Sequence, residues 1–144
     1  ESSLSDWMQN KWRNLTEGQI LNLWDVPHPI EDGLLNEDGI FNDAPLNGTL
    51  REVLDDIGGQ FSHSFKRMIQ VEAMDANTGS FVGFTEKTVS YDDFSTASVA
   101  SSSIPGVFAS TKIGPYVLFD GGMIYSANLV SAIQRCREIT TSDN

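Results

Sequence analysis

The chain has 144 residues, 40% hydrophobic and 20% charged, which is enough for one globular domain and too few for two well-packed ones. Nine basic residues against twenty acidic ones give a net charge of −11, without the clustered lysine and arginine that bind nucleic acid or anionic lipid. We therefore expect no nucleic-acid partner, and we interpret the acidic surface as a solubility device.

The first predicted elements are two short helices between residues 5 and 24. Apolar side chains recur there at helical spacing: Trp7, Met8, Trp12 and Leu15. Ser5 can cap the first helix, and Thr16 followed by Gln19 has the capping-box pattern, so we expect a break near Gly18. The apolar stripe favours packing against the core or a partner, and a lipid-facing surface is the alternative.

Residues 26–48 have the composition of a loop, because prolines and Asp-Gly and Asn-Gly pairs interrupt them. A loop of this length is unusual in a compact domain, so it is expected to wrap over a surface. Thr49 with Glu52 three residues later predicts the start of a helix, and Gly58-Gly59 predicts its end. The apolar face of this helix would be Leu50, Val53, Leu54 and Ile57.

The second half of the chain alternates strands and helices. We predict strands over residues 67–73 and 80–85, joined by a turn at 75–79, then a tightly packed helix of small residues over 92–102 that ends before Pro105-Gly106. Later in the chain follow a short apolar strand, a glycine-rich turn and a helix: 116–119, 120–122 and 128–139. This order predicts an α/β layered fold with about three strands, a small part of an ordinary sheet.

Metal and cofactor chemistry is not predicted. His28, His63 and Cys136 do not have the spacing of metal ligands. The segment 75–79 begins like a calcium loop, but no glutamate stands at the twelfth position, so a turn is favoured. The chain has no glycine-rich phosphate-binding loop, and we expect no cofactor.

The single cysteine allows no internal disulfide, which fits a reducing intracellular compartment. Sequons occur at Asn14 and Asn47, although such triplets often arise by chance. No signal peptide and no apolar run of about 18 residues is present. We therefore expect a soluble or peripherally membrane-associated protein without a transmembrane segment.

A serine nucleophile is not found. A nucleophile elbow needs Gly-x-Ser-x-Gly, and in Gly79–Gly83 the serine comes one position early. No Gly-Gly-Gly oxyanion loop occurs, and a histidine next to serines, as in His63 with Ser62 and Ser64, is rarely catalytic. On composition alone Asp120-Gly121-Gly122 is a turn, although an aspartate flanked by glycines at a strand end can be approached closely by another group.

Two motifs stand close together in the second half of the chain. The first is Ser-Ser-Ile-Pro-Gly-Val-Phe at residues 102–108, and the second is Asp120-Gly121-Gly122 after a strand. Together they resemble the patatin-like phospholipase family. Pro45-Leu46 before a leucine-bearing helix, and Val71–Asp75 followed by Thr78-Gly79, are similar to further family segments. The resemblance covers residues 39–139, with residues 1–38 a helical or loop segment of unassigned role. It implies the C-terminal portion of a three-layer α/β/α domain.

By this resemblance Asp120 is the catalytic aspartate of a Ser–Asp dyad in a lipid acyl hydrolase, with Gly121 and Gly122 completing its motif. The serine and the oxyanion loop would lie in an N-terminal part of the same protein, and the substrate would be a lipid or another acyl ester. The chain departs from the family after this motif, where Asn128 is present but the usual proline is missing. The alternative is a non-catalytic relative that serves as a scaffold or interaction subunit.

Overall fold

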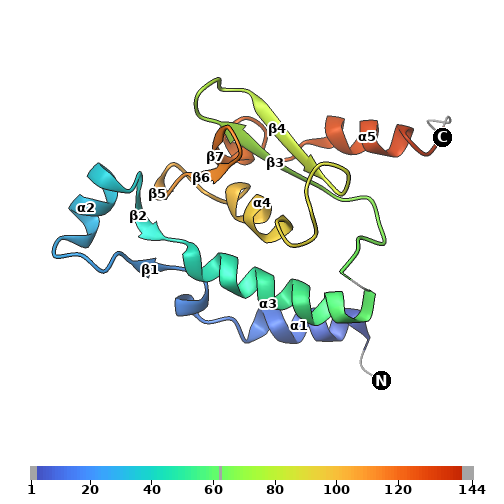
Figure 1. Cartoon of the computed structure of the whole chain (residues 1–144), viewed down its shortest axis with the longest axis horizontal. Coiled ribbons are helices and arrows are strands. Elements are labelled where there is room, and N and C mark those ends of the chain that lie inside the picture. The colour runs from blue at the N-terminus through green and yellow to red at the C-terminus, as the bar shows by residue number, and fades with distance from the viewer. Residues whose placement is uncertain (1–2, 62, 141–144) are drawn as a thin grey trace.

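The computed structural model describes residues 3–61 and 63–140, in which helices and strands alternate (Figure 1). The helices are α1 (Leu4–Arg13), α2 (Pro29–Asn36), α3 (Ala44–Phe61), α4 (Phe94–Ala100) and α5 (Leu129–Arg137), with 3-10 turns η1 (Glu17–Gln19) and η2 (Gly121–Met123). The strands are β1 (Asn22–Leu23), β2 (Gly39–Asn42), β3 (Gln70–Asp75), β4 (Phe81–Thr85), β5 (Gly106–Phe108), β6 (Thr111–Ile113) and β7 (Tyr116–Asp120). The expected partial α/β domain is confirmed.

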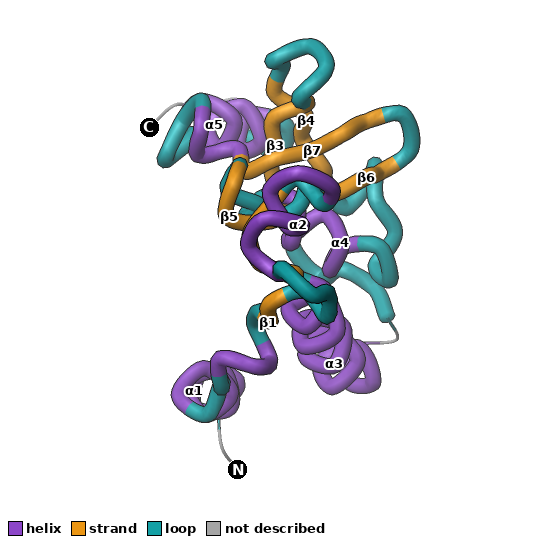
Figure 2. Tube along the Cα trace, turned by 90° about the vertical axis from the view of Figure 1, so that its left-hand side faces the viewer, coloured by secondary structure: helices purple, strands orange, loops and turns teal. Residues whose placement is uncertain are grey.

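The strands form two sheets. The smaller has the order β1-β2-β5, in which β2 and β5 run parallel with Gly39 opposite Gly106. The larger has the order β4-β3-β7-β6, and each of its pairs is antiparallel. Figures 1 and 2 show α4 against this larger sheet, α3 beyond α4, and α1 at the far end of the molecule.

The core lies between α4 and the larger sheet. Its buried side chains are Ala73, Phe84, Ala97, Ala100 and Leu118. Alanines on the inner face of α4 allow the helix backbone to approach β3 and β7 closely, as the small-residue pattern of this segment predicts. This close packing fixes the end of β7, where Asp120 stands.

The first third of the chain corrects several expectations. The cap of α1 is Ser3, whose hydroxyl accepts from the Asp6 N–H, and not Ser5. A break follows α1, which ends at Arg13, but it precedes Gly18, which lies inside η1. The capping-box contact is present, since the Thr16 N–H donates to the Gln19 side chain at 2.9 Å. The second predicted helix is wrong beyond this 3-10 turn, because β1 follows it. The apolar stripe does not enter the core: the exposed fraction is 55% for Met8 and 78% for Trp12.

The loop expected over residues 26–48 is wrong, because this segment contains α2, β2 and the start of α3. Pro29 occupies the first turn of α2, where its missing N–H costs nothing. Helix α3 begins at Ala44, so Thr49 lies inside it and donates to the carbonyl of Gln19 at 2.7 Å. The helix also continues past Gly58-Gly59 to Phe61.

The second half follows the prediction more closely. Strands β3, β4 and β7, the turn before β4, and helices α4 and α5 all lie where the pattern indicated, with shifted ends. The expectation of about three strands is wrong, since the described residues form seven. The missed strands β1, β2, β5 and β6 are two to four residues long, which is too short for an alternating pattern to appear.

Candidate active site around Asp120

Asp120 is the last residue of β7 and lies opposite Ala73 of β3. Its backbone N–H donates to the carbonyl of Ser103 at 2.9 Å. This bond joins the Ser-Ser-Ile-Pro segment after α4 to the Asp-Gly-Gly segment that begins at the end of β7. The structure therefore brings together the two motifs that are separate in the sequence.

The glycines after Asp120 have different functions. The Asp120 Oδ1 atom accepts from the Gly122 N–H at 2.8 Å, so the carboxylate caps the 3-10 turn that follows. Gly121 is buried, and a Cβ added to it would lie 2.6 Å from the carbonyl oxygen of Glu72. A side chain at Gly121 would therefore push the segment away from β3, whereas Gly122 holds the carboxylate by its main chain.

A cleft of about 280 Å³ is lined by Asp120, Gly121 and Gly122, and also by Gln70, Val71, Glu72, Phe81, Ser101, Tyr125, Ser126 and Asn128. Larger cavities lie elsewhere, one of about 470 Å³ between α1 and α3 and one of about 500 Å³ between β3 and α5. We place the candidate site in the smaller cleft because it holds the Asp120 carboxylate of the Asp-Gly-Gly motif, oriented by the Gly122 N–H, and a carboxylate so placed can take a proton from a hydroxyl group. Sequence reasoning did not identify the cleft residues outside the motif.

Ser103, the second serine of the Ser-Ser-Ile-Pro motif, is structural. Its side chain is fully buried, and its Oγ lies 2.9 Å from the Val99 carbonyl, 3.2 Å from the Asp43 carboxylate and 3.2 Å from Thr111 Oγ1. Burial raises the pKa of Asp43, and the contact with Ser103 partly offsets this rise. The cluster joins the end of β2, the end of α4 and β6, and thereby fixes the strand end at Asp120.

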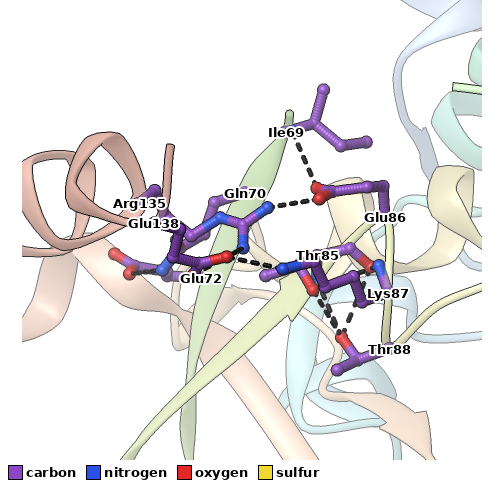
Figure 3. A network of polar contacts seen from close by, with 9 residues as sticks. All are labelled: Ile69, Gln70, Glu72, Thr85, Glu86, Lys87, Thr88, Arg135 and Glu138. Atoms are coloured by element: carbon purple, nitrogen blue, oxygen red, sulfur yellow. Dashed lines mark hydrogen bonds and ion pairs between the residues drawn. The ribbon is translucent and has the colours of Figure 1, made fainter. Parts of the chain in front are cut away.

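A second polar cluster joins α5 to the β3–β4 ribbon (Figure 3). The Arg135 guanidinium pairs with the Glu86 and Glu138 carboxylates, and Glu86 also accepts from the Ile69 N–H at 3.0 Å. The Ile69 N–H and then Arg135 lower the pKa of Glu86 to about 2. Lys87 pairs with Glu138 on the exposed side of this cluster. Glu86 is 49 positions from Arg135, and Lys87 is 51 positions from Glu138, so no local pattern could have predicted these two pairs. Only the pair of Arg135 with Glu138, three positions apart, is local.

The remaining candidates do not join the cleft. His63 is exposed and packs its ring against Tyr91, with 5.7 Å between the ring centroids. Ser62 lies outside the described residues. The Asp75 carboxylate accepts from Thr78 Oγ1 at 2.7 Å, which supports the predicted turn. Within residues 3–61 and 63–140, no three histidine, cysteine or acidic side chains gather as metal ligands would.

No helix of the described part of the chain has the length and apolar character needed to cross a bilayer.

A family model described as patatin-like phospholipase matches residues 1–133. The match therefore includes the first 38 residues as well as the segments that carry the two motifs. Comparison with curated proteins and with solved structures gives no match to the chain.

Proposed function

The chain belongs to the patatin-like phospholipase family, and we propose that it contributes the catalytic aspartate, Asp120, to a lipid acyl hydrolase with a Ser–Asp dyad. The observation that carries the proposal is the position of the carboxylate. Asp120 ends a strand, opens onto a cleft and is oriented by the Gly122 N–H at 2.8 Å. Gly121 and Gly122 complete the motif, one by its close approach to β3 and the other by its hydrogen bond.

The proposed reaction is acyl transfer through a serine. Asp120 accepts the proton of the serine hydroxyl while the oxygen attacks the ester carbonyl, and backbone N–H groups stabilise the oxyanion. The alcohol leaves with that proton, and an acyl-enzyme remains. Water then attacks the acyl group while Asp120 accepts its proton. Asp120 returns this proton to the serine oxygen as the acyl–serine bond breaks, which regenerates the serine and releases the fatty acid.

We propose that the serine and the oxyanion loop belong to an N-terminal part of the same protein. Gly-x-Ser-x-Gly does not occur in the chain. Two helices also present large apolar side chains to solvent: Ile30, Leu34 and Leu35 of α2, and Leu129, Val130 and Ile133 of α5. Apolar faces of this kind usually pack against another part of a protein, which supports a larger domain around the described elements.

The test is Asp120→Asn in the protein at its full natural length, with hydrolysis of a lipid acyl ester as the readout. The amide oxygen can still accept from the Gly122 N–H, so the fold is retained while the proton acceptor is lost. We expect the rate to fall at least about 100-fold, the contribution of a general base. The control is Asp25→Asn at an exposed position, which should keep parental activity. Parental activity of D120N would overturn the dyad.

A fluorophosphonate probe with intact-mass analysis tests the location of the serine. One adduct on a polypeptide heavier than 15.8 kDa, mapped N-terminal to this chain, is the expected result. A polypeptide that takes no label would instead favour the non-catalytic scaffold.

A further inference from the structure

We infer that Glu72 and Asn128 form a clamp that positions the segment carrying Asp120. The inference rests on the proposed function, since it concerns how Asp120 is held for the reaction. Glu72 and Asn128 are positioning residues, and Asp120 is the residue that exchanges the proton.

The segment from Asp120 to Asn128 is attached at both ends to neighbouring residues of β3. At its start Asp120 pairs with Ala73, and at its end Asn128 Nδ2 donates to Glu72 Oε2 at 2.7 Å. Between these points the ring of Tyr125 contacts Phe81 of β4, with 5.7 Å between the ring centroids. The segment is therefore a loop closed onto the β3–β4 ribbon.

The register explains why Glu72 can hold this loop. Strand β7 pairs with β3 only from Ala73 to Asp75, so Gln70–Glu72 extend beyond the end of β7. The chain after Asp120 passes along this part of β3, where Gly121 packs against the Glu72 carbonyl. Side chains alternate along a strand, so Glu72 projects from the face opposite to that of Ala73. The loop thus starts opposite Ala73 and ends on the carboxylate of Glu72.

Hydrogen bonds and ion pairs, more than apolar burial, hold the helix after this loop. No residue of α5 is buried, and Leu129, Val130 and Ile133 are each at least half exposed. Asn128 fixes the start of the helix, where its Oδ1 also accepts from the Ser131 N–H at 3.1 Å, and Arg135 fixes the end through Glu86. Without the Glu72 contact, the start of α5 and the loop before it would lose their side-chain bond to β3.

Glu72 is well suited to this function, because each of its carboxylate oxygens accepts a hydrogen bond from a neutral side-chain amide. Gln70 Nε2 donates to Oε1 at 2.5 Å (Figure 3), and Asn128 Nδ2 donates to Oε2. A misplacement of about 1 Å in a catalytic group can reduce a rate about 100-fold. Release of the loop is therefore expected to lower kcat and to leave KM nearly unchanged.

The test is Asn128→Asp in the full-length protein. Aspartate is as good an N-cap as asparagine, so the bond to the Ser131 N–H is kept, while a second carboxylate now faces Glu72. We expect kcat to fall about 10- to 100-fold, with KM within about threefold of the parent. Adding Glu72→Gln should restore most of kcat, because its amide nitrogen can donate to the new carboxylate and its oxygen can still accept from Gln70. If Asn128 only capped α5, N128D would keep the parental kcat, and adding E72Q would have no loss of kcat to restore.

Parental kcat in N128D, or a loss that E72Q does not rescue, would overturn the clamp. Should N128D fail to fold, N128S provides the same comparison, because serine caps the helix but cannot reach Glu72 in the same way. D120N assayed in parallel separates the two hypotheses. An active D120N overturns the proposed dyad, and the clamp with it. An inactive D120N beside a fully active N128D overturns the clamp alone.

Discussion

Gly121 illustrates how a single residue determines the geometry around Asp120. Its backbone conformation is not of the left-handed kind that favours glycine, so conformational freedom does not explain it. The explanation is space, because the Glu72 carbonyl lies where a Cβ would be. The Asp-Gly-Gly motif therefore depends on the neighbouring strand as much as on its own turn.

We predict that Gly121→Ala destabilises the full-length protein by about 1–3 kcal/mol, the usual cost of forcing an extra methyl group into a packed site. A backbone carbonyl 2.6 Å away cannot move without β3, so the substitution should also lower the rate of ester hydrolysis. Chemical denaturation and kinetic assays measure the two effects.

The matched control for that substitution is Gly48→Ala. Gly48 lies inside α3 with no heavy atom within 4 Å of an added Cβ, so alanine should stabilise the helix by about 0.5–1 kcal/mol. A G121A protein as stable as the parent would show that a methyl group fits between Gly121 and β3, which would contradict the prediction.

At the residue scale, contiguous motifs are predictable and dispersed contacts are not. Asp120 and its glycines form a short string of residues, so the family resemblance can propose them as the candidate site directly from the sequence. Glu72 and Asn128 are separated by 56 positions, and a glutamate in a strand has no local feature that indicates its partner. The same holds for Asp43 and Ser103, which are 60 positions apart.

At the scale of elements, prediction succeeded where a pattern was long enough to be distinctive. Strand β7 is an apolar run, and α4 is a run of small residues, so both were found. Helix α2 was missed because His28-Pro29 has the composition of a loop, although proline is favoured in the first turn of a helix. Strand β5 was missed because its three residues, Gly106–Phe108, are recognisable as a strand only through their pairing with β2.

The attachment of α5 should depend on pH through Glu86. Its folded-state pKa is about 2 against an ordinary value of 4.5, so its stabilising contribution is complete above about pH 4.5 and is lost as the pH falls through 2. Glu86→Gln removes this titration. We therefore expect the Tm of the full-length protein to exceed that of E86Q at pH 6, by a margin that shrinks steadily towards pH 2. A margin that is constant with pH would contradict the role of the Glu86 carboxylate.

At the scale of the whole molecule, the apolar residues are divided between a small core and several uncovered faces. Three of the five residues in the core cluster are alanines, which bury little area. Meanwhile Trp12, Leu35 and Leu129 are each at least 70% exposed. In the smaller sheet the parallel β2–β5 pair is short, and parallel strands are normally covered on both faces. Composition alone could not reveal this imbalance, because the overall hydrophobic fraction is ordinary.

This imbalance predicts that residues 1–144 expressed alone will not fold cooperatively. Few apolar side chains of the described residues are buried for a chain of 144 residues, and the short strands need further sheet partners for independent stability. We expect a broad thermal transition by circular dichroism and strong binding of a hydrophobic dye, whereas the full-length protein should melt sharply and bind little dye. A sharp cooperative melt of residues 1–144 alone would show that the exposed faces of α2 and α5 need not pack against another part of the protein. These faces would then no longer support the proposal of an N-terminal part that carries the serine.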